Sequence, residues 1–212
     1  MNTQAHDLID NQGTAHVHQD PIGAKTGMWL FLFTELLLFG GLFIIYAVYR
    51  GQYAHGFTEA ASHLNVWMGV TNTVVLLTSS LTMVLGVSSL QRNNLGLAQL
   101  YLSGTILLAF TFLLIKFFEW GAKRDHGIFP GMEHLHSMPH GEGLFFNLYF
   151  MMTGLHGIHV IIGIAVMIVL YNRLQNGTLT RENQGQLEYT GLYWHLVDLV
   201  WIFLLPLFYL TN

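Results

Sequence analysis

The sequence predicts an all-α integral membrane protein, a bundle of five transmembrane helices. Of its 212 residues, 52% are hydrophobic and only 9% are charged, whereas a soluble domain carries about 25% charged residues. Five apolar runs are long enough to cross a bilayer, which takes about 20 residues. Backbone polar groups in lipid must be satisfied within their own segment, so these runs are expected to be helices.

The expected spans follow one another along a single domain that covers residues 25–212. They lie near residues 26–49, 66–90, 97–120, 143–171 and 190–210. Aromatic residues with a polar edge gather near the span ends, as in the belts at membrane interfaces. These residues are Tyr46, Tyr49, Tyr101, Trp120, Tyr171, Tyr193, Trp194 and Tyr209.

Two segments are too polar to lie in lipid. Residues 1–24 have neither a basic region nor an apolar core of a signal peptide, and we expect a mobile polar tail. Its histidines His6, His16 and His18 can in principle bind a metal, although solvated side chains are the simpler interpretation. Residues 121–142 contain two prolines and four histidines, and we expect them to form an ordered cap on one face. The other connections are expected to be short.

Charge and cysteine content exclude several functions. A net charge of −4 with eight Lys and Arg makes nucleic acid an unsuitable partner. The absence of cysteine excludes disulfides and thiolate metal sites.

A small excess of Lys and Arg favours a cytoplasmic N-terminus, and five crossings then place the C-terminus outside. The expected inner positions are Lys25, Arg92, Arg173 and Arg181, and the outer ones are Arg50, Lys123 and Arg124.

Four of the five spans contain ionisable side chains, which are costly in hydrocarbon and almost always face the interior of a bundle. Three pairs have the spacing i, i+3, so that both members share one helix face. The candidates are Glu35, Lys116, Glu119, His156, His159, His195 and Asp198.

Depth divides these candidates into two groups. At 1.5 Å per residue, Glu35, His159, His195 and Asp198 lie at a similar depth, so we expect them to meet in one layer of an intramembrane polar network with His156. Lys116 and Glu119 lie at the end of their span, where lysine can extend to the interface. We expect them to form an ion pair at the membrane rim.

Each polar group has more than one interpretation. The histidines can ligate haem, which takes one His from each of two helices, or can join helices in a hydrogen-bonded cluster. Since only two spans offer histidines, the cluster is the preferred interpretation. Glu35 can carry a proton or can fix packing through a bond to an imidazole, and both remain open. The hydroxyls of "TNTVVLLTSSLT" in the second span are expected to serve packing.

Four segments resemble one known family. "GMWLFLFTELLLFGGLF", "KFFEW", "TGLHGIHVIIG" and "YWHLVDLVWIFLLPL" are similar to stretches of the cytochrome c oxidase polypeptide III family, subunit III of the haem–copper terminal oxidases. Their order and spacing also match. The resemblance runs from about Gly27 to the C-terminus.

The resemblance implies a cofactor-free accessory subunit of a proton-pumping oxidase that reduces dioxygen to water. Haem and copper would belong to partner subunits I and II. This chain would pack on subunit I, bind phospholipid, and support proton uptake and sustained turnover. The ionisable positions would then form a structural and proton-environment network, with no catalytic, cofactor-binding or metal-binding residue.

The chain departs from the full-length family, whose members have seven helices, because it starts where the third would start. It resembles the short five-helix bacterial form, which implies a bacterial plasma membrane. A quinol oxidase subunit III and a nitric-oxide-reductase accessory protein share that form, although "KFFEW" and "HGIHVIIG" favour the cytochrome c oxidase version. A haem-binding membrane anchor is a less well supported alternative. A transporter is a further one, and it is poorly supported since no inverted repeat or broken helix pair is evident.

Overall fold

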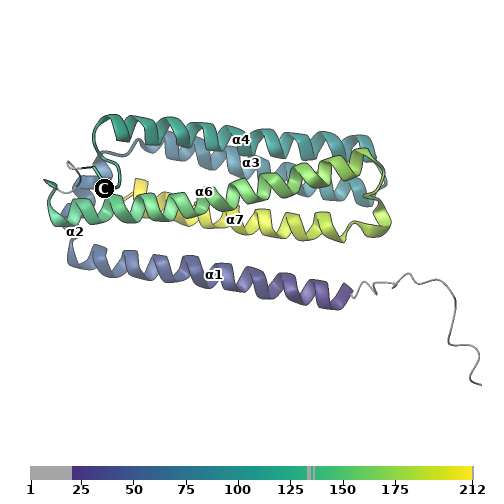
Figure 1. The fold of residues 1–212 in the computed structure, drawn as a ribbon, viewed down its shortest axis with the longest axis horizontal. Coiled ribbons are helices and arrows are strands. Elements are labelled where there is room, and N and C mark those ends of the chain that lie inside the picture. The colour runs from purple at the N-terminus through teal and green to yellow at the C-terminus, as the bar shows by residue number, and fades with distance from the viewer. Residues whose placement is uncertain (1–20, 133–134, 136, 212) are drawn as a thin grey trace, which may run out of the picture.

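The computed structural model describes residues 21–132, 135 and 137–211, and within them the chain is helical without a strand (Figure 1). Five of its helices are long and apolar enough to cross a membrane, so the predicted all-α membrane bundle is confirmed. In chain order the elements are α1 (Pro21–Gln52), α2 (Ala54–Ser62), α3 (Val66–Gln91), α4 (Leu95–Asp125), α6 (His140–Gln175), the 3-10 turn η1 (Arg181–Asn183) and α7 (Gly185–Tyr209).

The ends of the spans differ from expectation by a few residues. Helix α1 begins at Pro21, so the last four residues of the expected tail are helical, and residues 1–20 with His6, His16 and His18 lie outside the described residues. Helix α4 continues to Asp125, five residues beyond the predicted end. This extension places Lys116 and Glu119 well inside the helix.

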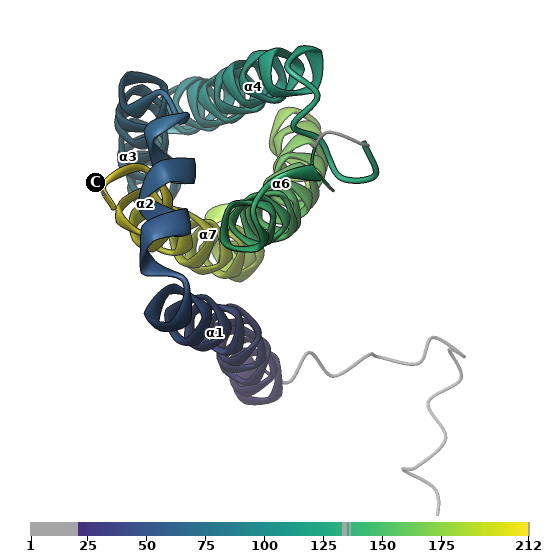
Figure 2. The same ribbon diagram turned by 90° about the vertical axis from the view of Figure 1, so that its left-hand side faces the viewer.

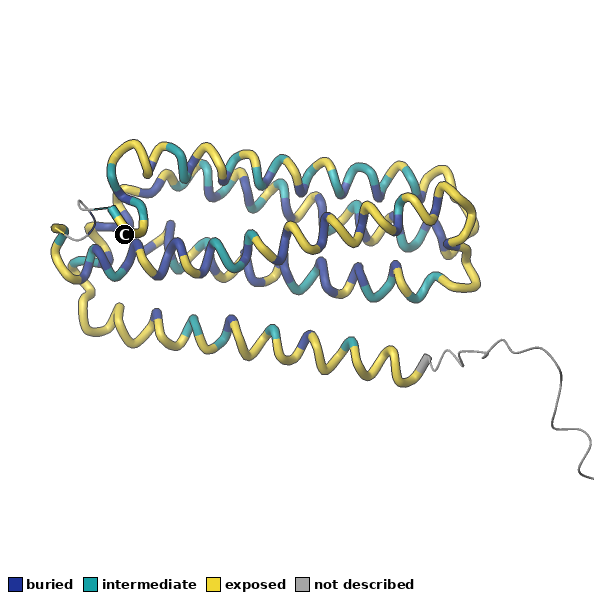
Figure 3. The backbone as a smooth tube through the Cα atoms, viewed as in Figure 1, coloured by how far each residue is buried: buried dark blue, intermediate teal, exposed yellow. Residues whose placement is uncertain are grey.

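Four helices form a bundle and the fifth lies to one side. Figure 2 shows α3, α4, α6 and α7 around a common interior, with α1 outside it and nearest to α7 and α6. Only 11% of the most apolar stretch of α1 is buried, compared with 50% for α7. The exposed surface of α1 is visible along its whole length in Figure 3. In a membrane this apolar surface faces lipid or other polypeptides.

The connection between the first two spans, expected only to be short, contains the helix α2. Helix α2 lies across one end of the bundle (Figure 2). It buries Phe57, Ala60 and Ala61, whose i, i+3, i+4 spacing places them on one face. A Cβ atom on Gly56 would lie 3.0 Å from the Cα atom of Gly141, so the backbones of α2 and α6 are in direct contact.

Local side chains explain where several helices begin and end. Asn65 caps α3 by accepting hydrogen bonds from the amides of Trp67 and Met68, and Asn94 caps α4 by accepting one from Leu97. After α6 the chain adopts a positive φ of 68° at Gly177, a backbone conformation that glycine adopts without strain.

The expected cap at residues 121–142 is shorter than predicted, because α4 and α6 extend into it from both sides. Ile128 and Leu135 from the remaining connection are buried in the core. Two of its four histidines, His134 and His136, lie outside the described residues.

Half of the expected aromatic belt lies inside the protein. Tyr46, Tyr193, Trp194 and Tyr209 are all buried, and each polar edge has a partner there. The Tyr46 hydroxyl donates to the Leu207 carbonyl, and the Trp194 indole donates to Ser79 Oγ at 2.9 Å. These aromatic residues therefore join helices, which their position near a span end did not reveal.

Candidate functional site

The Lys116–Glu119 ion pair lies inside the bundle, between α4, α6 and α7. Lys116 Nζ is 2.9 Å from Glu119 Oε2, one helical turn further along α4. The same nitrogen donates to the hydroxyl of Tyr149 at 2.9 Å and to that of Tyr209 at 3.0 Å. Both hydroxyls in turn donate to Glu119 Oε1, at 2.8 Å and 2.6 Å. We call these four residues the ionic cluster.

The ionic cluster is closed, because its members satisfy one another. An ammonium group has three donors, and Lys116 directs them to one carboxylate oxygen and two phenol oxygens. Its charge also lies 5.1 Å from the centroid of the Trp201 ring, an attractive cation–π arrangement. Burying a charge is tolerated when it is paired and fully hydrogen-bonded, and both conditions hold here.

The two charged residues of this pair are enclosed by protein, since Lys116 is 6% and Glu119 3% exposed. Two tyrosines from α6 and α7 provide oxygen acceptors for the lysine inside the bundle, and a position at the membrane rim stays a prediction. A third charged residue of the same α4 face, Lys123, is also buried. Its Nζ donates to the His63 carbonyl at 3.4 Å.

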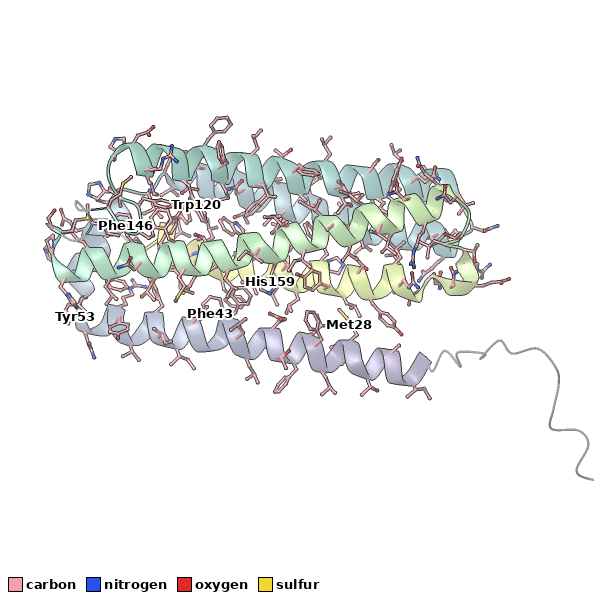
Figure 4. The ribbon with its side chains drawn as sticks, in the orientation of Figure 1. Met28, Phe43, Tyr53, Trp120, Phe146 and His159 are labelled. Atoms are coloured by element: carbon pink, nitrogen blue, oxygen red, sulfur yellow. The ribbon has the colours of Figure 1, made fainter. Side chains whose placement is uncertain are left out.

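The second ion pair joins α1 to α6. Glu35 Oε2 lies 2.9 Å from His159 Nε2, with side-chain exposures of 15% and 11%. The other ring nitrogen, Nδ1, lies 2.8 Å from the carbonyl of Leu155. Figure 4 shows His159 on the side of α6 toward α1, where Met28 and Phe43 also project.

The Glu35–His159 pair can share a proton without changing its net charge. A carbonyl oxygen only accepts, so Nδ1 of His159 carries a hydrogen. Nε2 then either donates to a Glu35 carboxylate or accepts from a protonated Glu35. Both arrangements are neutral overall, which suits a pair placed among apolar helices. An apolar groove of about 400 Å³ adjoins the pair and is lined by residues of α1, α6 and α7.

His195 and Asp198 form a separate group at the contact between α3 and α7. Nδ1 of His195 lies 2.6 Å from Ser80 Oγ. Asp198 is buried, and neither of its carboxyl oxygens has a hydrogen-bond partner of normal geometry among the described residues. Ser80 is nevertheless close enough to interact electrostatically with that carboxyl group. The hydroxyl of Ser80 thus bonds to His195 and lies near Asp198.

His156 is enclosed by aromatic rings. Its ring centroid lies 5.5 Å from that of Phe112 and 5.2 Å from that of Trp201. The side chain is fully buried, and neither ring nitrogen has a hydrogen-bond partner in the described part of the chain. His156 therefore contributes packing rather than a hydrogen bond.

The structure thus places the expected polar network at three locations. Glu35 with His159 joins α1 to α6, His195 with Asp198 lies between α3 and α7, and His156 packs among aromatic rings in the interior. Sequence reasoning missed Tyr149, Tyr209 and Ser80 as partners, because the distance along the sequence does not show which helix faces which. The expected packing role of the α3 hydroxyls agrees with the bonds from Trp194 to Ser79 and from Trp201 to Thr73.

The histidine geometry does not fit axial ligation of haem. Both nitrogens of His159 already have oxygen partners, and the His156 ring is packed directly against two aromatic rings. A porphyrin placed on either ring would require these contacts to break. The described residues also contain no group of three or more His, Cys, Asp or Glu positioned to hold a metal ion.

Comparison with known proteins identifies the class to which this fold and its buried polar groups belong. The family model for cytochrome c oxidase subunit III matches residues 3–212 of the chain. The chain belongs to this family, the third subunit of the haem–copper oxidases.

Three relatives indicate the range of the family. The cytochrome c oxidase subunit 3 of Alkalihalophilus pseudofirmus is 31% identical over 88% of this chain and 85% of its own. The cytochrome bo(3) ubiquinol oxidase subunit 3 of Pseudomonas aeruginosa is 30% identical over 94% and 91%. The haem–copper oxidase subunit I+III of Aeropyrum pernix is 31% identical over 88% of this chain, which spans only 22% of that relative's length.

Proposed function

We propose that this chain is the cofactor-free subunit III of a proton-pumping cytochrome c oxidase in a bacterial plasma membrane. It packs on the haem-bearing subunit I, in a complex that also contains subunit II, and it supports proton uptake and sustained turnover. Haem and copper reside in those partners. The relative in which subunits I and III are a single polypeptide supports direct contact with subunit I.

The closed ionic cluster is the observation that carries this proposal. Lys116 and Glu119 saturate each other and two phenols, which supports a fixed structural role for this buried ion pair rather than a redox or substrate site. This arrangement supports an accessory role, in which the electron carriers that dioxygen reduction needs belong to partner subunits.

An optical experiment tests the absence of a redox centre. The tagged chain is released from the purified oxidase by a mild detergent, and visible spectra of both fractions are recorded. We expect all haem absorbance to remain with the residual complex and the released chain to be colourless. A haem spectrum that follows the chain, and that is lost in His156→Ala or His159→Ala, would instead establish a haem-binding anchor.

The electron donor separates two versions of the function. A quinol oxidase subunit 3 matches this chain at 30% identity, so a quinol oxidase is the second candidate. Oxygen uptake by the purified complex is measured with reduced cytochrome c and with a short-chain quinol. We expect uptake with cytochrome c, and uptake with quinol alone would assign the chain to a quinol oxidase.

We also propose that the chain binds phospholipid, in a groove between α4 and α6. This groove measures about 610 Å³ and is lined mostly by apolar side chains, such as Phe117, Trp120 and Ile158, together with Lys116 and Thr153. Gly154 and Gly157 form part of the wall, and their missing side chains leave room for an acyl chain.

A glycine substitution tests the lipid groove. A Cβ atom at Gly157 would meet nothing within 4 Å, so Gly157→Leu can fill the groove without disturbing the fold. We expect this variant of the oxidase to lose a copurifying phospholipid, quantified by mass spectrometry. Gly104→Leu on α4, which also has open space but lies outside this groove, is the matched control. Unchanged lipid content in Gly157→Leu would refute this site.

The proposed orientation has a cytoplasmic N-terminus and an external C-terminus. Because the chain contains no cysteine, single cysteines report accessibility without background. We expect Asn176→Cys, between α6 and α7, to be labelled by a membrane-impermeant maleimide only after the cells are opened. His126→Cys, at the other end of the bundle, should react in intact cells, and the reverse pattern would invert the topology.

A further inference from the structure

The contact between α3 and α7 presents a polar group on an otherwise apolar outer surface. His195 and Ser80 are each partly exposed, and they bond to each other through Nδ1 of the imidazole. Nε2 of His195 has no hydrogen-bond partner among the described residues, although the neighbouring Nδ1 has one. A free imidazole nitrogen facing hydrocarbon is costly, because lipid offers no hydrogen bond.

Exposed apolar residues flank this group on both helices. Leu77 lies one turn before Ser80 on α3, and Leu199 lies one turn after His195 on α7, so each shares a helix face with its polar neighbour. Both leucines are exposed, by 49% and 44%. Figure 2 shows α3, α7 and α1 in succession along this side of the molecule. We call the surface formed by Leu77, Ser80, His195 and Leu199 the α3–α7 face.

We propose that the α3–α7 face is the contact surface for a transmembrane helix of the haem-bearing subunit, which presents a hydrogen-bonding side chain to Nε2 of His195. This inference rests on the proposed assembly and locates it. Apolar side chains on both sides of a polar centre match the way membrane helices associate, by packing with a few interhelical hydrogen bonds. Asp198 follows His195 by one helical turn on α7 and is buried. It adds a carboxyl group close to Ser80.

The depth of His195 in the membrane distinguishes a neighbouring protein from lipid as the occupant of this face. His195 lies ten residues from the start of α7 and fourteen from its end, or about 15–21 Å along the helix axis at 1.5 Å per residue. Polar headgroups lie outside a hydrocarbon core about 30 Å thick. A headgroup therefore does not reach Nε2, whereas a side chain from a neighbouring helix can.

Crosslinking in the assembled oxidase tests the face directly. A photoreactive benzoylphenylalanine is introduced at Leu77 or Leu199, and at Leu107 on α4 as an exposed control site. After illumination of membranes, we expect Leu77 and Leu199 to form a product that contains a transmembrane peptide of the haem-bearing subunit. A product with lipid alone, or with a second copy of this chain, would overturn the proposal.

A substitution at the polar centre provides the second test. His195→Leu removes the polar group, which would be harmless or favourable if the face met lipid. We expect it to lower the haem recovered with the tagged chain by about three- to tenfold, the range for one interhelical hydrogen bond. His195→Gln should recover part of the loss. The matched control is Thr111→Val on α4, an exposed hydroxyl bonded only to its own helix.

The outcomes separate this inference from the proposed function. Normal haem recovery in His195→Leu, with no crosslink to the haem-bearing subunit, would overturn the assigned face while leaving assembly intact. If no haem copurified even with the unmodified chain, the assembly itself would be refuted. Loss of haem in His195→Leu together with loss of the chain from membranes would reflect misfolding, and in that case the crosslinks of the Leu77 and Leu199 variants decide.

Discussion

The Lys116–Glu119 and Glu35–His159 pairs both lie among apolar helices, yet their surroundings differ. Lys116 and Glu119 are enclosed by α4, α6 and α7 and have two tyrosines as further partners. Glu35 and His159 lie where the loosely packed α1 meets the bundle, beside an apolar groove. The comparison indicates that the first pair is enclosed on all sides by the bundle, whereas the second is only partly enclosed. A proton-carrying role of Glu35 stays a prediction.

The largest expected effect comes from opening the closed pair. Lys116→Met leaves the Glu119 carboxylate buried without its counter-charge, which costs about 3–5 kcal/mol. We expect a corresponding fall in the free energy of unfolding of the chain, measured by SDS titration in mixed micelles. Lys25→Met, at an exposed position near the start of α1, is the control. Equal free energies of unfolding for Lys116→Met and Lys25→Met would contradict the view that the Lys116–Glu119 pair fixes the fold.

A smaller effect is expected at the pair on α1. Glu35→Leu leaves Nε2 of His159 without a partner, a loss of about 1–3 kcal/mol for an unsatisfied polar group. The two side chains retain 11–15% exposure, so local adjustment reduces the cost below that of Lys116→Met. The same SDS titration compares the variants, and a loss as large as that of Lys116→Met would contradict the ranking.

The smallest effect on stability is expected for Glu35→Gln, which retains a hydrogen bond to His159 but does not release a proton. We expect the free energy of unfolding to change by less than about 1 kcal/mol and the haem content of the complex to be unchanged. Proton release by oxidase vesicles, followed with a pH-sensitive dye during turnover, should decline. Unaltered proton release would assign the pair to packing alone.

The positions of the spans could be predicted, because hydropathy is a property of each segment by itself. The membrane-spanning helices α3 and α7 lie close to the predicted 66–90 and 190–210. Helix α2 could also have been recognised from the spacing of Phe57, Ala60 and Ala61. It was missed because it lies in a short connection between two much stronger apolar signals.

The arrangement of the polar groups could not be predicted to the same extent. Counting residues estimates how deep Glu35 and His195 lie, but it does not say how far each helix is rotated about its axis. Packing between helices sets that rotation, and it directs Glu35 to His159 and His195 to Ser80. The hydroxyl partners of Lys116 could not be predicted for a related reason, because Tyr149 and Tyr209 come from distant parts of the chain.

The claim that buried charges persist because they satisfy one another is tested most directly by a double-mutant cycle. The free energy of unfolding is measured for the parent chain, Lys116→Met, Glu119→Gln and the combined variant. We predict that the combined variant loses less than the sum of the single variants, with a coupling of about 1–3 kcal/mol for residues in one network. Additive losses would show that Lys116 and Glu119 are tolerated independently, and would contradict the account.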